Sequence, residues 1–536
     1  MKNKLFVTSM STLIGLYGVL IIFLIPVAYF TNLRMDYFML GAIGFLVLQF
    51  LLAPFFTDLI MRYLYKADFN INMPDYLVQF INQVCTEHNM KYPKIGYITD
   101  GAPNAFTYGR TKNDARIVLT KGIFDLLTPD EVKSVVAHEM GHAIHYDMLF
   151  MTVAQIIPLL LRWVYEITIN SSDNNDKDSG SLAIVGLIAF ILHIISEYVI
   201  LWFSRTREYY ADEFSVQKTK NPFAMSNALV KVGYGLVTSN EDTGKKKIDI
   251  SSVSALGIFD KKTSKTLVVT SYNDGKLETD KIKKAARWEL WNPWATWYEL
   301  HSTHPRISKR LKAISKMAPQ YNQSPYIVFD EVKPESYSDD FAIELFIKFF
   351  PYLIILGTGL FVYSLINNGN TSFVEVIGIG LILLGVSSLI KLRRAYKNDN
   401  YKETKVSDLL GEVKVSQVTS VPCTLTGTFI GRGTPGYIFS EDFVLKDETG
   451  IVFIDYKQPL SIMNIFFGIF KAKNYINKNV TITGWYKRSP VPYVELNYMV
   501  VDGIKKKCYT YGFIKVMTAL LFVAGLVVTL YGLIMY

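Results

Sequence analysis

Two histidines and a glutamate lie at a spacing that suits a metal-dependent hydrolase. His138 and His142 are four positions apart, so on a helix both imidazoles lie on one face, one turn apart. Imidazole is a common zinc ligand, and Glu139 is placed to take a proton from a water on the ion. With only seven histidines in 536 residues, such a pair is seldom accidental. The alternative is two surface histidines on an ordinary helix.

The residues before this motif predict the helix that it requires. Thr128 is a candidate N-cap, Pro129 suits the first helical position, and Glu131 completes a capping box. A helix over 128–148 would carry the histidines on its third and fourth turns.

A catalytic zinc site needs a third protein ligand. In the longer motif with three histidines it would be residue 148, with glycine at 145, but His145 and Met148 occupy these positions. A glutamate from a later helix is the other option. Glu208 and Asp212 are four residues apart, so we assign Glu208 as the third ligand and Asp212 as an acceptor that orients a ligand histidine. The alternative is a charged helix end that leaves a membrane.

Four segments, in order, resemble the membrane metallopeptidases that include HtpX and the CAAX prenyl proteases. They are Asn104-Ala105-Phe106-Thr107-Tyr108-Gly109, His138-Glu139-x-x-His142, Ser204-Arg205-x-x-Glu208-x-x-Ala211-Asp212, and Ser302-Thr303-His304-Pro305 followed by Arg310. The resemblance covers about residues 1–320. It implies a gluzincin-type endopeptidase with one zinc ion and a catalytic Glu139.

The resemblance also suggests roles for two further segments. Asn104, Ala105 and Phe106 would begin an edge strand that binds peptide substrates through main-chain hydrogen bonds, although a plain strand fits the local sequence equally well. His304 would donate to the oxyanion or brace the site, and a helix-starting His-Pro without a catalytic role is the alternative. We interpret His145 as structural, because a fourth ligand would close the water position.

The composition predicts a mainly α-helical integral membrane protein. Half of the residues are hydrophobic and 14% are aromatic. About seven apolar runs are long enough to cross a bilayer. They cover roughly 5–30, 37–60, 149–169, 182–203, 341–366, 373–390 and 513–535. The first follows Lys2 and Lys4 but is too long for a signal peptide, so we expect an uncleaved anchor.

Basic residues predict how the chain crosses the membrane. The basic residues of the connectors 31–36, 170–181 and 367–372 are Arg34 and Lys177 alone. The positive-inside rule then places the N-terminus, the metal site and the β-rich segment in the cytoplasm, and the C-terminus outside, in a multi-pass cell-membrane protein. The net charge of +9 fits faces near anionic lipid rather than a nucleic-acid partner. The three cysteines suit free thiols in a reducing compartment.

Ionisable residues inside the predicted spans are a separate question. Arg162 lies in the third span, and His193 and Glu197 lie one turn apart in the fourth. One hypothesis is that His193, Glu197 and Glu208 line a wet cavity on the route to the metal. The alternative is an ion pair between Glu197 and Arg162.

The pattern divides the chain into five regions: two N-terminal spans (1–60), a zinc peptidase domain (61–340) with the span hairpin 149–203, two spans (341–390), a cytoplasmic β-rich domain (391–512) and a last span (513–536). An insert near 240–280 predicts a loop or small hairpin. Tryptophans recur every third residue at 288–297, which indicates an interfacial or packed aromatic face.

The β-rich domain holds five strand-like runs, which predict a small OB-like barrel. They are Cys423–Ile430, Tyr437–Leu445, Ile451–Asp455, Val480–Tyr486 and Val491–Val501. The apolar residues 459–470 suit a membrane surface. The barrel has no catalytic constellation, so a regulatory or substrate-presenting role and a purely structural one both stand.

Together these features predict an HtpX-like zinc endopeptidase that cleaves membrane or misfolded proteins on the cytoplasmic side. Protein or peptide substrates and the lipid bilayer are the expected partners. The alternatives are a CAAX-type prenyl-protein peptidase and a non-catalytic zinc-binding membrane scaffold. The sequence predicts neither the cleavage preference nor the oligomeric state.

Overall fold

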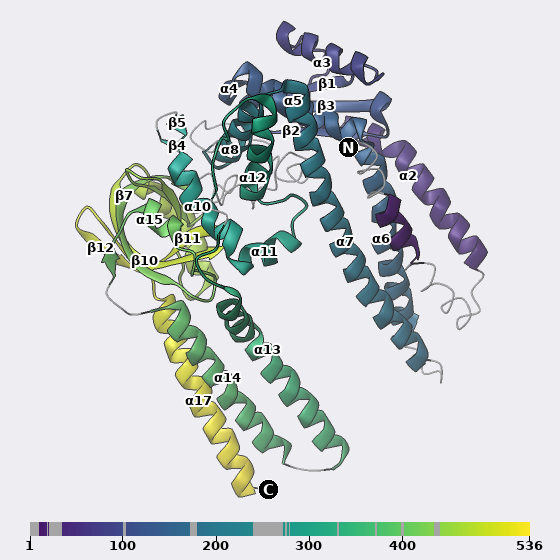
Figure 1. Cartoon of the computed structure of the whole chain (residues 1–536). Coiled ribbons are helices and arrows are strands. Elements are labelled where there is room, and N and C mark those ends of the chain that lie inside the picture. Colours follow the sequence, from purple (N-terminus) through teal and green to yellow (C-terminus); the bar gives the residue numbers. More distant parts are fainter. Residues whose placement is uncertain are drawn as a thin grey trace. The chain divides into compact units, whose positions relative to one another are not determined.

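The computed structural model describes residues 10–18, 20, 35–99, 103–171, 179–238, 272–273, 276–277, 279–329, 332–369, 372–397, 401–433 and 440–535. The chain divides into two compact units. The first consists of 1–239, 243–265 and 299–328, and the second of 240–242, 266–298 and 329–536. Helices predominate in both units (Figure 1).

A three-stranded sheet and helix α5 form the centre of the first unit. The strands are β1 (Lys94–Ile98), β2 (Ala105–Gly109) and β3 (Ala115–Thr120), in the order β1-β3-β2. The middle strand β3 is buried along its whole length, parallel to β1 and antiparallel to β2. Since β2 pairs with β3 alone among the described strands, it is an edge strand, and it packs against α5.

Long helices surround this centre. They are α2 (Met35–Tyr63), α3 (Asp75–Glu87), α4 (Lys121–Leu126), α5 (Pro129–Ile144), α6 (Asp147–Ser171), α7 (Ser179–Thr219), α8 (Pro222–Thr238) and α12 (Ile307–Met317), with short 3-10 turns at Lys112–Asp114 and Ala318–Tyr321. The 41 residues of α7 extend about 62 Å at 1.5 Å per residue, about twice the hydrocarbon thickness of a bilayer. One helix can therefore cross a membrane and still carry polar residues beyond it.

Five described helices are long and apolar enough to cross a membrane. They cover Asp147–Ile169, Ala183–Thr219, Ser338–Asn367, Phe373–Ala395 and Thr510–Ile534, and each contains or overlaps one predicted span. The chain is thus a multi-pass membrane protein. Predicted span 37–60 forms helix α2, which is not among these five, and 5–30 lies largely outside the described residues. The total of seven spans stays a prediction.

The ionisable residues of the third and fourth spans have local partners. Arg162 Nε lies 2.9 Å from Glu166 Oε1. His193 Nε2 lies 3.6 Å from Glu197 Oε1, and its Nδ1 lies 3.1 Å from the carbonyl oxygen of Pro158. The expected pair between Arg162 and Glu197 is therefore wrong, because each residue pairs one turn away on its own helix. The cavity hypothesis stays a prediction.

Three apolar helices of the second unit meet a β-barrel. They are α13 (Ser338–Asn367), α14 (Phe373–Ala395) and α17 (Thr510–Met535). Helices α14 and α17 run antiparallel in close contact. A Cβ atom at Gly378 would lie 2.5 Å from the backbone nitrogen of Thr529, so glycine is required for this approach.

The barrel contains β7 (Val421–Arg432), β8 (Phe443–Lys446), β9 (Ile451–Asp455), β10 (Asn479–Ser489) and β11 (Val491–Val501). The order β7-β8-β9-β11-β10 closes on itself because β10 also pairs with β7. Short strands β6 (Lys402–Glu403) and β12 (Ile504–Lys507) extend it. The five-stranded barrel was predicted. The run predicted to begin at Tyr437 forms β8 from Phe443, and residues 437–439 lie outside the described residues.

The tryptophan-rich helices belong mostly to this second unit. Helices α10 (Thr279–Trp291) and α11 (Pro293–Leu300) place Trp288 and Trp294 in the barrel's hydrophobic core. Trp288 Nε1 donates to the carbonyl of Val415 at 2.8 Å. The aromatic face is thus packed. Remaining elements are the hairpin β4–β5 (Tyr272–Asn273 and Lys276–Leu277), α15 (Val406–Gly411), α16 (Ser461–Phe470) and a 3-10 turn at Ala472–Tyr475. The rest of the 240–280 insert lies outside the described residues.

Candidate metal centre

Helix α5 begins as its sequence predicts and ends earlier. Thr128 and Glu131 form the capping box, in which the backbone nitrogen of Thr128 donates to Glu131 Oε2 at 2.9 Å. The predicted end at residue 148 is wrong. Ile144 is the last helical residue, Tyr146 has a positive φ of 59°, and α6 begins at Asp147. This break changes the chain direction one turn after the second histidine.

Three side chains from α5 and α7 converge with their ligand atoms toward one point. The Nε2 atoms of His138 and His142 lie 3.2 Å apart. Glu208 Oε2 lies 3.6 Å from the first of these nitrogens, and Glu208 Oε1 lies 3.5 Å from the second. Tetrahedral ligands at about 2.0–2.1 Å from zinc would lie about 3.3–3.4 Å from one another. Two imidazole nitrogens and a carboxylate that approaches each of them with a different oxygen therefore form a donor set suited to a metal ion, with one ligand atom from each residue within 4.8 Å of the others.

Each ligand histidine has a carboxylate on its other ring nitrogen. Asp212 Oδ1 lies 3.0 Å from Nδ1 of His138, the position expected for this residue. Asp147 Oδ2 lies 2.7 Å from Nδ1 of His142. Such contacts keep the proton on Nδ1 and leave the Nε2 lone pair for the metal. Asp147 was not predicted, because it meets His142 only through the break at Tyr146.

Two arginines hold these carboxylates. Arg310 from α12 donates from Nε and Nη2 to the two oxygens of Asp212, at 2.8 and 2.6 Å, and its Nη1 lies 3.3 Å from Glu208 Oε2. Burial lowers the pKa of Arg310, but the adjacent charge of Asp212 outweighs it and raises the pKa overall. Arg207 Nη1 donates to the backbone carbonyl of Asp147 at 2.6 Å, and its Nε lies 3.8 Å from the carboxylate oxygen Oδ1 of the same residue. Each histidine therefore contacts an aspartate that in turn contacts an arginine.

The site favours positive charge. Burial lowers the pKa of His138, but the bonds to Asp212 and Glu208 outweigh it and raise the pKa to about 9. The same carboxylates would stabilise a metal cation at this position. The charge of the site and the spacing of its donor atoms therefore both suit a metal ion.

Glu139 is only 2% exposed, and Thr107 of β2 holds it in place. Thr107 Oγ1 lies 2.8 Å from Glu139 Oε2 and 3.1 Å from its carbonyl oxygen. Burial raises the pKa of Glu139 above its usual range, while His142, His138 and Thr107 act in the opposite direction. Thr107 lay in the segment singled out from the sequence, but its contact with the base could not be foreseen, because it joins a strand to a helix.

The segment predicted as an edge strand forms one. Asn104 precedes β2 and is bound to Thr120, whose Oγ1 accepts from its backbone nitrogen at 2.7 Å. The Ala105 and Phe106 side chains are fully buried, the latter in a hydrophobic cluster, so any contact from β2 to a peptide would use its backbone. The strand ends at Gly109, where φ is +147° and a Cβ would lie 2.3 Å from the carbonyl of Asp114.

His304 lies beside the third ligand. Its Nε2 atom is 3.6 Å from Glu208 Oε1, and its Nδ1 atom is 2.9 Å from Thr303 Oγ1. Arg205 Nη1 holds this loop by donating to the carbonyls of Glu299 and Ser302, each at 2.7 Å. His145, interpreted as structural, packs edge-on against Phe214 with ring centroids 5.6 Å apart.

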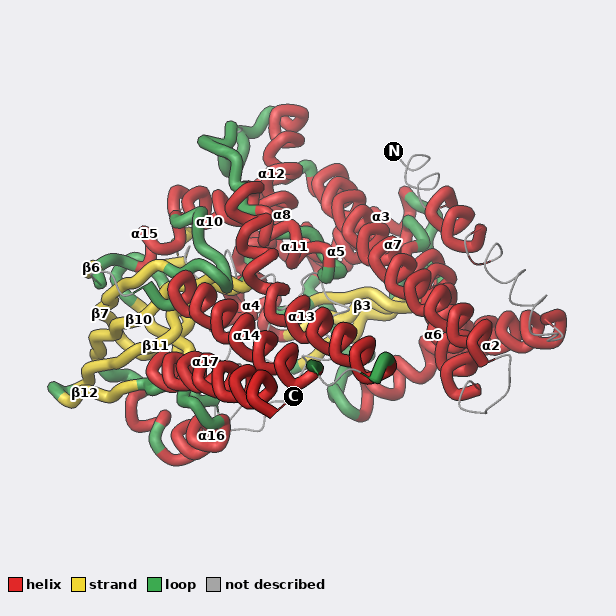
Figure 2. The backbone as a smooth tube through the Cα atoms, turned by 90° about the horizontal axis from the view of Figure 1, so that it is seen from below, coloured by secondary structure: helices red, strands yellow, loops and turns green. Residues whose placement is uncertain are grey.

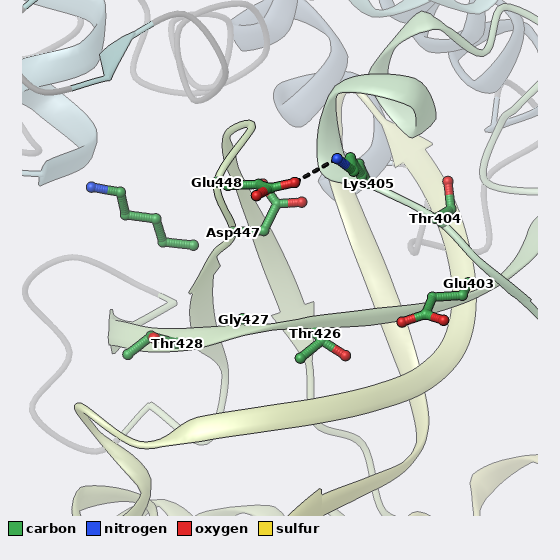
Figure 3. Close-up of a pocket in the computed structure, with 9 residues that line it drawn as sticks. Glu403, Thr404, Lys405, Thr426, Gly427, Thr428, Asp447 and Glu448 are labelled. Carbon is green, nitrogen blue, oxygen red and sulfur yellow. Dashed lines mark ion pairs between the residues drawn. The ribbon is translucent and has the colours of Figure 1, made fainter.

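A groove of about 550 Å³ on the barrel is a second concave site (Figure 3). Its lining includes Thr426, Thr428, Asp447 and the ion pair between Lys405 and Glu448, 2.5 Å apart. No histidine or cysteine is among its described lining residues.

Comparison with known proteins identifies the segment that carries the metal centre. A family model described as peptidase family M48 matches residues 74–318, which include all three ligand residues and Glu139. Residues 74–318 are thus similar to peptidase family M48. This match confirms the resemblance to membrane metallopeptidases that the four sequence motifs predicted.

Curated relatives agree with this assignment. A "Protease HtpX homolog" from Methanothermobacter thermautotrophicus is 35% identical over 28% of this chain and 57% of its own length. Those from Aeropyrum pernix and Campylobacter hominis are 27% and 31% identical, over 48% and 32% of this chain and 80% and 62% of their own lengths. The chain thus spans less than two thirds of two of these three relatives. The crystal structure of S. mikatae Ste24p, 18% identical, covers 58% of this chain and 67% of its own with a TM-score of 0.34.

Proposed function

We propose that this chain is an HtpX-like zinc-dependent endopeptidase that hydrolyses peptide bonds of membrane or misfolded proteins at the cytoplasmic face. The observation that carries the proposal is the convergence, beside a buried glutamate, of two imidazole nitrogens 3.2 Å apart with the Glu208 carboxylate, whose two oxygens lie 3.6 and 3.5 Å from them. The names of the M48 relatives support the same activity.

One zinc ion fits the donor set best. Two imidazole nitrogens and one carboxylate oxygen leave a coordination position open, as catalytic zinc sites require. His138, His142 and Glu208 would hold the ion. When bound, zinc supplies Lewis-acid polarisation of the substrate carbonyl and makes a water acidic near neutral pH.

The protein's own groups then carry the proton and hold the substrate. Glu139 takes a proton from the attacking water and passes it to the leaving amine. Thr107 keeps the Glu139 carboxylate in one orientation during both transfers. The free backbone edge of β2 aligns an extended peptide by main-chain hydrogen bonds. His304 is close enough to brace Glu208 or to donate to the developing oxyanion.

The proposal extends to membrane sidedness and to the barrel. The sparse basic residues of three connectors support a cytoplasmic metal site and barrel and an external C-terminus. The spatial strand order β7-β8-β9-β11-β10, with helix α16 between β9 and β10 in the sequence, supports an OB-like barrel. We assign the barrel a regulatory or substrate-presenting role.

The activity is tested with the full-length chain in lipid nanodiscs and an unfolded model protein as substrate. Chelation should abolish cleavage and zinc should restore it. Glu139→Gln should retain zinc and lose nearly all turnover, because only the base is changed, whereas Asp125→Asn, which changes an exposed carboxylate on α4, should cleave normally. Normal turnover by Glu139→Gln contradicts the mechanism. Zinc binding without cleavage favours the scaffold alternative, and cleavage confined to prenylated peptides favours the CAAX-type alternative.

A further inference from the structure

Helix α16 presents its apolar side chains outward from the barrel. Phe467 faces inward, where its ring stacks on Tyr456 at 3.8 Å between centroids. The other large apolar side chains of the segment are 41–65% exposed, namely Leu460, Ile462, Met463, Ile465, Phe466, Ile469 and Phe470. An apolar surface of this kind in water is unfavourable, so the outward face of α16 needs a cover.

The start of α16 is fixed to the start of a membrane span. Gln458 Nε2 donates to the carbonyl of Lys507 at 3.0 Å, and its Oε1 accepts from the backbone nitrogen of Tyr509 at 3.1 Å. Thr510 Oγ1 donates to the carbonyl of Lys457 at 2.7 Å. Thr510 is the first residue of α17, so α16 begins where this span leaves the barrel (Figure 2).

A second span meets the barrel at the same end. Antiparallel α14 and α17 are joined by Ser388 and Thr518, 2.6 Å apart, and the rings of Tyr396 and Tyr511 lie 5.4 Å apart just before the barrel. The last turn of α14 carries Arg393 and Arg394. Basic and aromatic residues next to apolar spans mark a membrane–water boundary. The boundary therefore lies at the level from which α16 starts.

The length and flanks of α16 suit that boundary. Ten residues extend about 15 Å, half of the hydrocarbon thickness, so the helix cannot cross a bilayer. Exposed Lys457, Lys471 and Lys473 lie at its two ends, and Lys505, Lys506 and Lys507 precede the span that it adjoins. Lysines around an apolar helix face favour the interface of an anionic bilayer.

We propose that α16 lies in the headgroup–acyl boundary of the bilayer that α14 and α17 cross, with Ile462, Ile465, Phe466 and Ile469 in contact with lipid. The helix holds the barrel against the membrane surface and restricts its rotation about the two spans. The inference rests on the second unit alone, so it stands whether or not the proposed peptidase activity is found.

The test places a fluorophore on α16 in the full-length chain. Phe466→Cys and, one turn away on the same face, Ile462→Cys are labelled in nanodiscs of phosphatidylcholine and phosphatidylglycerol. The native cysteines of the chain are buried. Glu448→Cys on the barrel groove, 71% exposed as a side chain, is the matched water-facing control. Quenching is measured with spin-labelled lipid and, separately, with aqueous iodide.

The expected result is several-fold stronger quenching by spin-labelled lipid at both α16 sites than at residue 448, with the opposite order for iodide. Iodide quenching at 466 and 462 equal to that at 448, without quenching by lipid, overturns the proposal. Protection of the α16 sites from both quenchers also overturns it, because a protein surface would then cover the helix.

Discussion

The imidazole of His142 and the carboxylate of Asp147 lie 2.7 Å apart, Nδ1 to Oδ2, across the break that separates α5 from α6. Asp147 is the first residue of an apolar helix long enough to cross the membrane. The opposite ligand, Glu208, is carried by the helix that returns from it. The span hairpin therefore supplies one carboxylate at each of its ends, so assembly of the metal centre depends on correct insertion of α6 and α7.

Asp147→Asn should weaken metal binding by about 10–100-fold, the usual cost of removing an outer-shell partner. The amide keeps the shape of the side chain but loses the charge that makes His142 a better ligand. Metal affinity is measured by competition with a chromogenic chelator. Asp125→Asn on α4 changes an exposed carboxylate that pairs only with Lys121, and should leave affinity unchanged. Equal affinities for the two variants would contradict the role given to Asp147.

Arg310→Ala should destabilise the first unit by about 3–5 kcal/mol, because the buried charge of Asp212 loses its bidentate partner. Arg310→Lys should recover only part of the loss, since a lysine cannot make both bonds. The effect is measured as the change in hydrogen-exchange protection of the α5 and α7 amides on heating. Lys316→Ala, at an exposed position on the same helix, is the control. An Arg310→Ala protein as stable as this control would show that Asp212 needs no partner.

Thr107→Val should reduce kcat by roughly 10–100-fold with little change in zinc content or stability. The methyl group replaces the hydroxyl that bonds Glu139 Oε2, and a hydrogen bond to a charged group contributes about 1.5–3 kcal/mol. Thr107→Ser should retain most of the activity because it keeps the hydroxyl. If valine and serine variants turn over at the same rate, Glu139 is oriented by other groups.

The sequence predicted those parts of the site that depend on spacing within one helix. His138, Glu139 and His142 share α5, and Glu208 and Asp212 share α7, so the 3.6-residue period alone puts each set on one face. Asp147, Arg207 and Thr107 escaped prediction, because their contacts join separate elements. Asp147 follows the left-handed residue Tyr146, and Thr107 lies on the edge strand β2. Both contact α5 only in the folded chain.

In the second unit, too, the sequence predicted elements with a local pattern and missed those that depend on contacts with other elements. Runs of β-branched and aromatic residues separated by turn signals placed β9 and β11 at their observed bounds. The two-residue strand β6 is too short for a periodic signal, and β12 is a lysine run that pairs only because β11 lies beside it. The recurrence of Trp288 and Trp294 predicted an aromatic face. That this face is buried in the barrel core required the tertiary structure.

The barrel should lose stability as the pH rises from about 5 to 8. Burial, with Asp455 and Glu441 nearby, raises the pKa of Asp442 to about 7, and burial with Glu495 raises that of Asp455 to about 6. The folded barrel thus keeps protons that the unfolded chain, with an ordinary aspartate pKa near 3.9, has released. More protons bound in the folded state means that unfolding becomes easier with rising pH up to about 7.

Hydrogen exchange of β10 and β11 amides in the full-length chain, compared between pH 5 and 8 after correction for intrinsic rates, should show a loss of about 4 kcal/mol. At 1.36 kcal/mol per pKa unit, Asp442 contributes about two thirds of this loss and Asp455 about one third. Asp442→Asn should remove most of this dependence because the amide does not ionise. Asp502→Asn, at an exposed position that pairs with Lys478, should leave it intact. Stability that rises with pH would show that the two carboxylates are ionised within the folded barrel and held by cations.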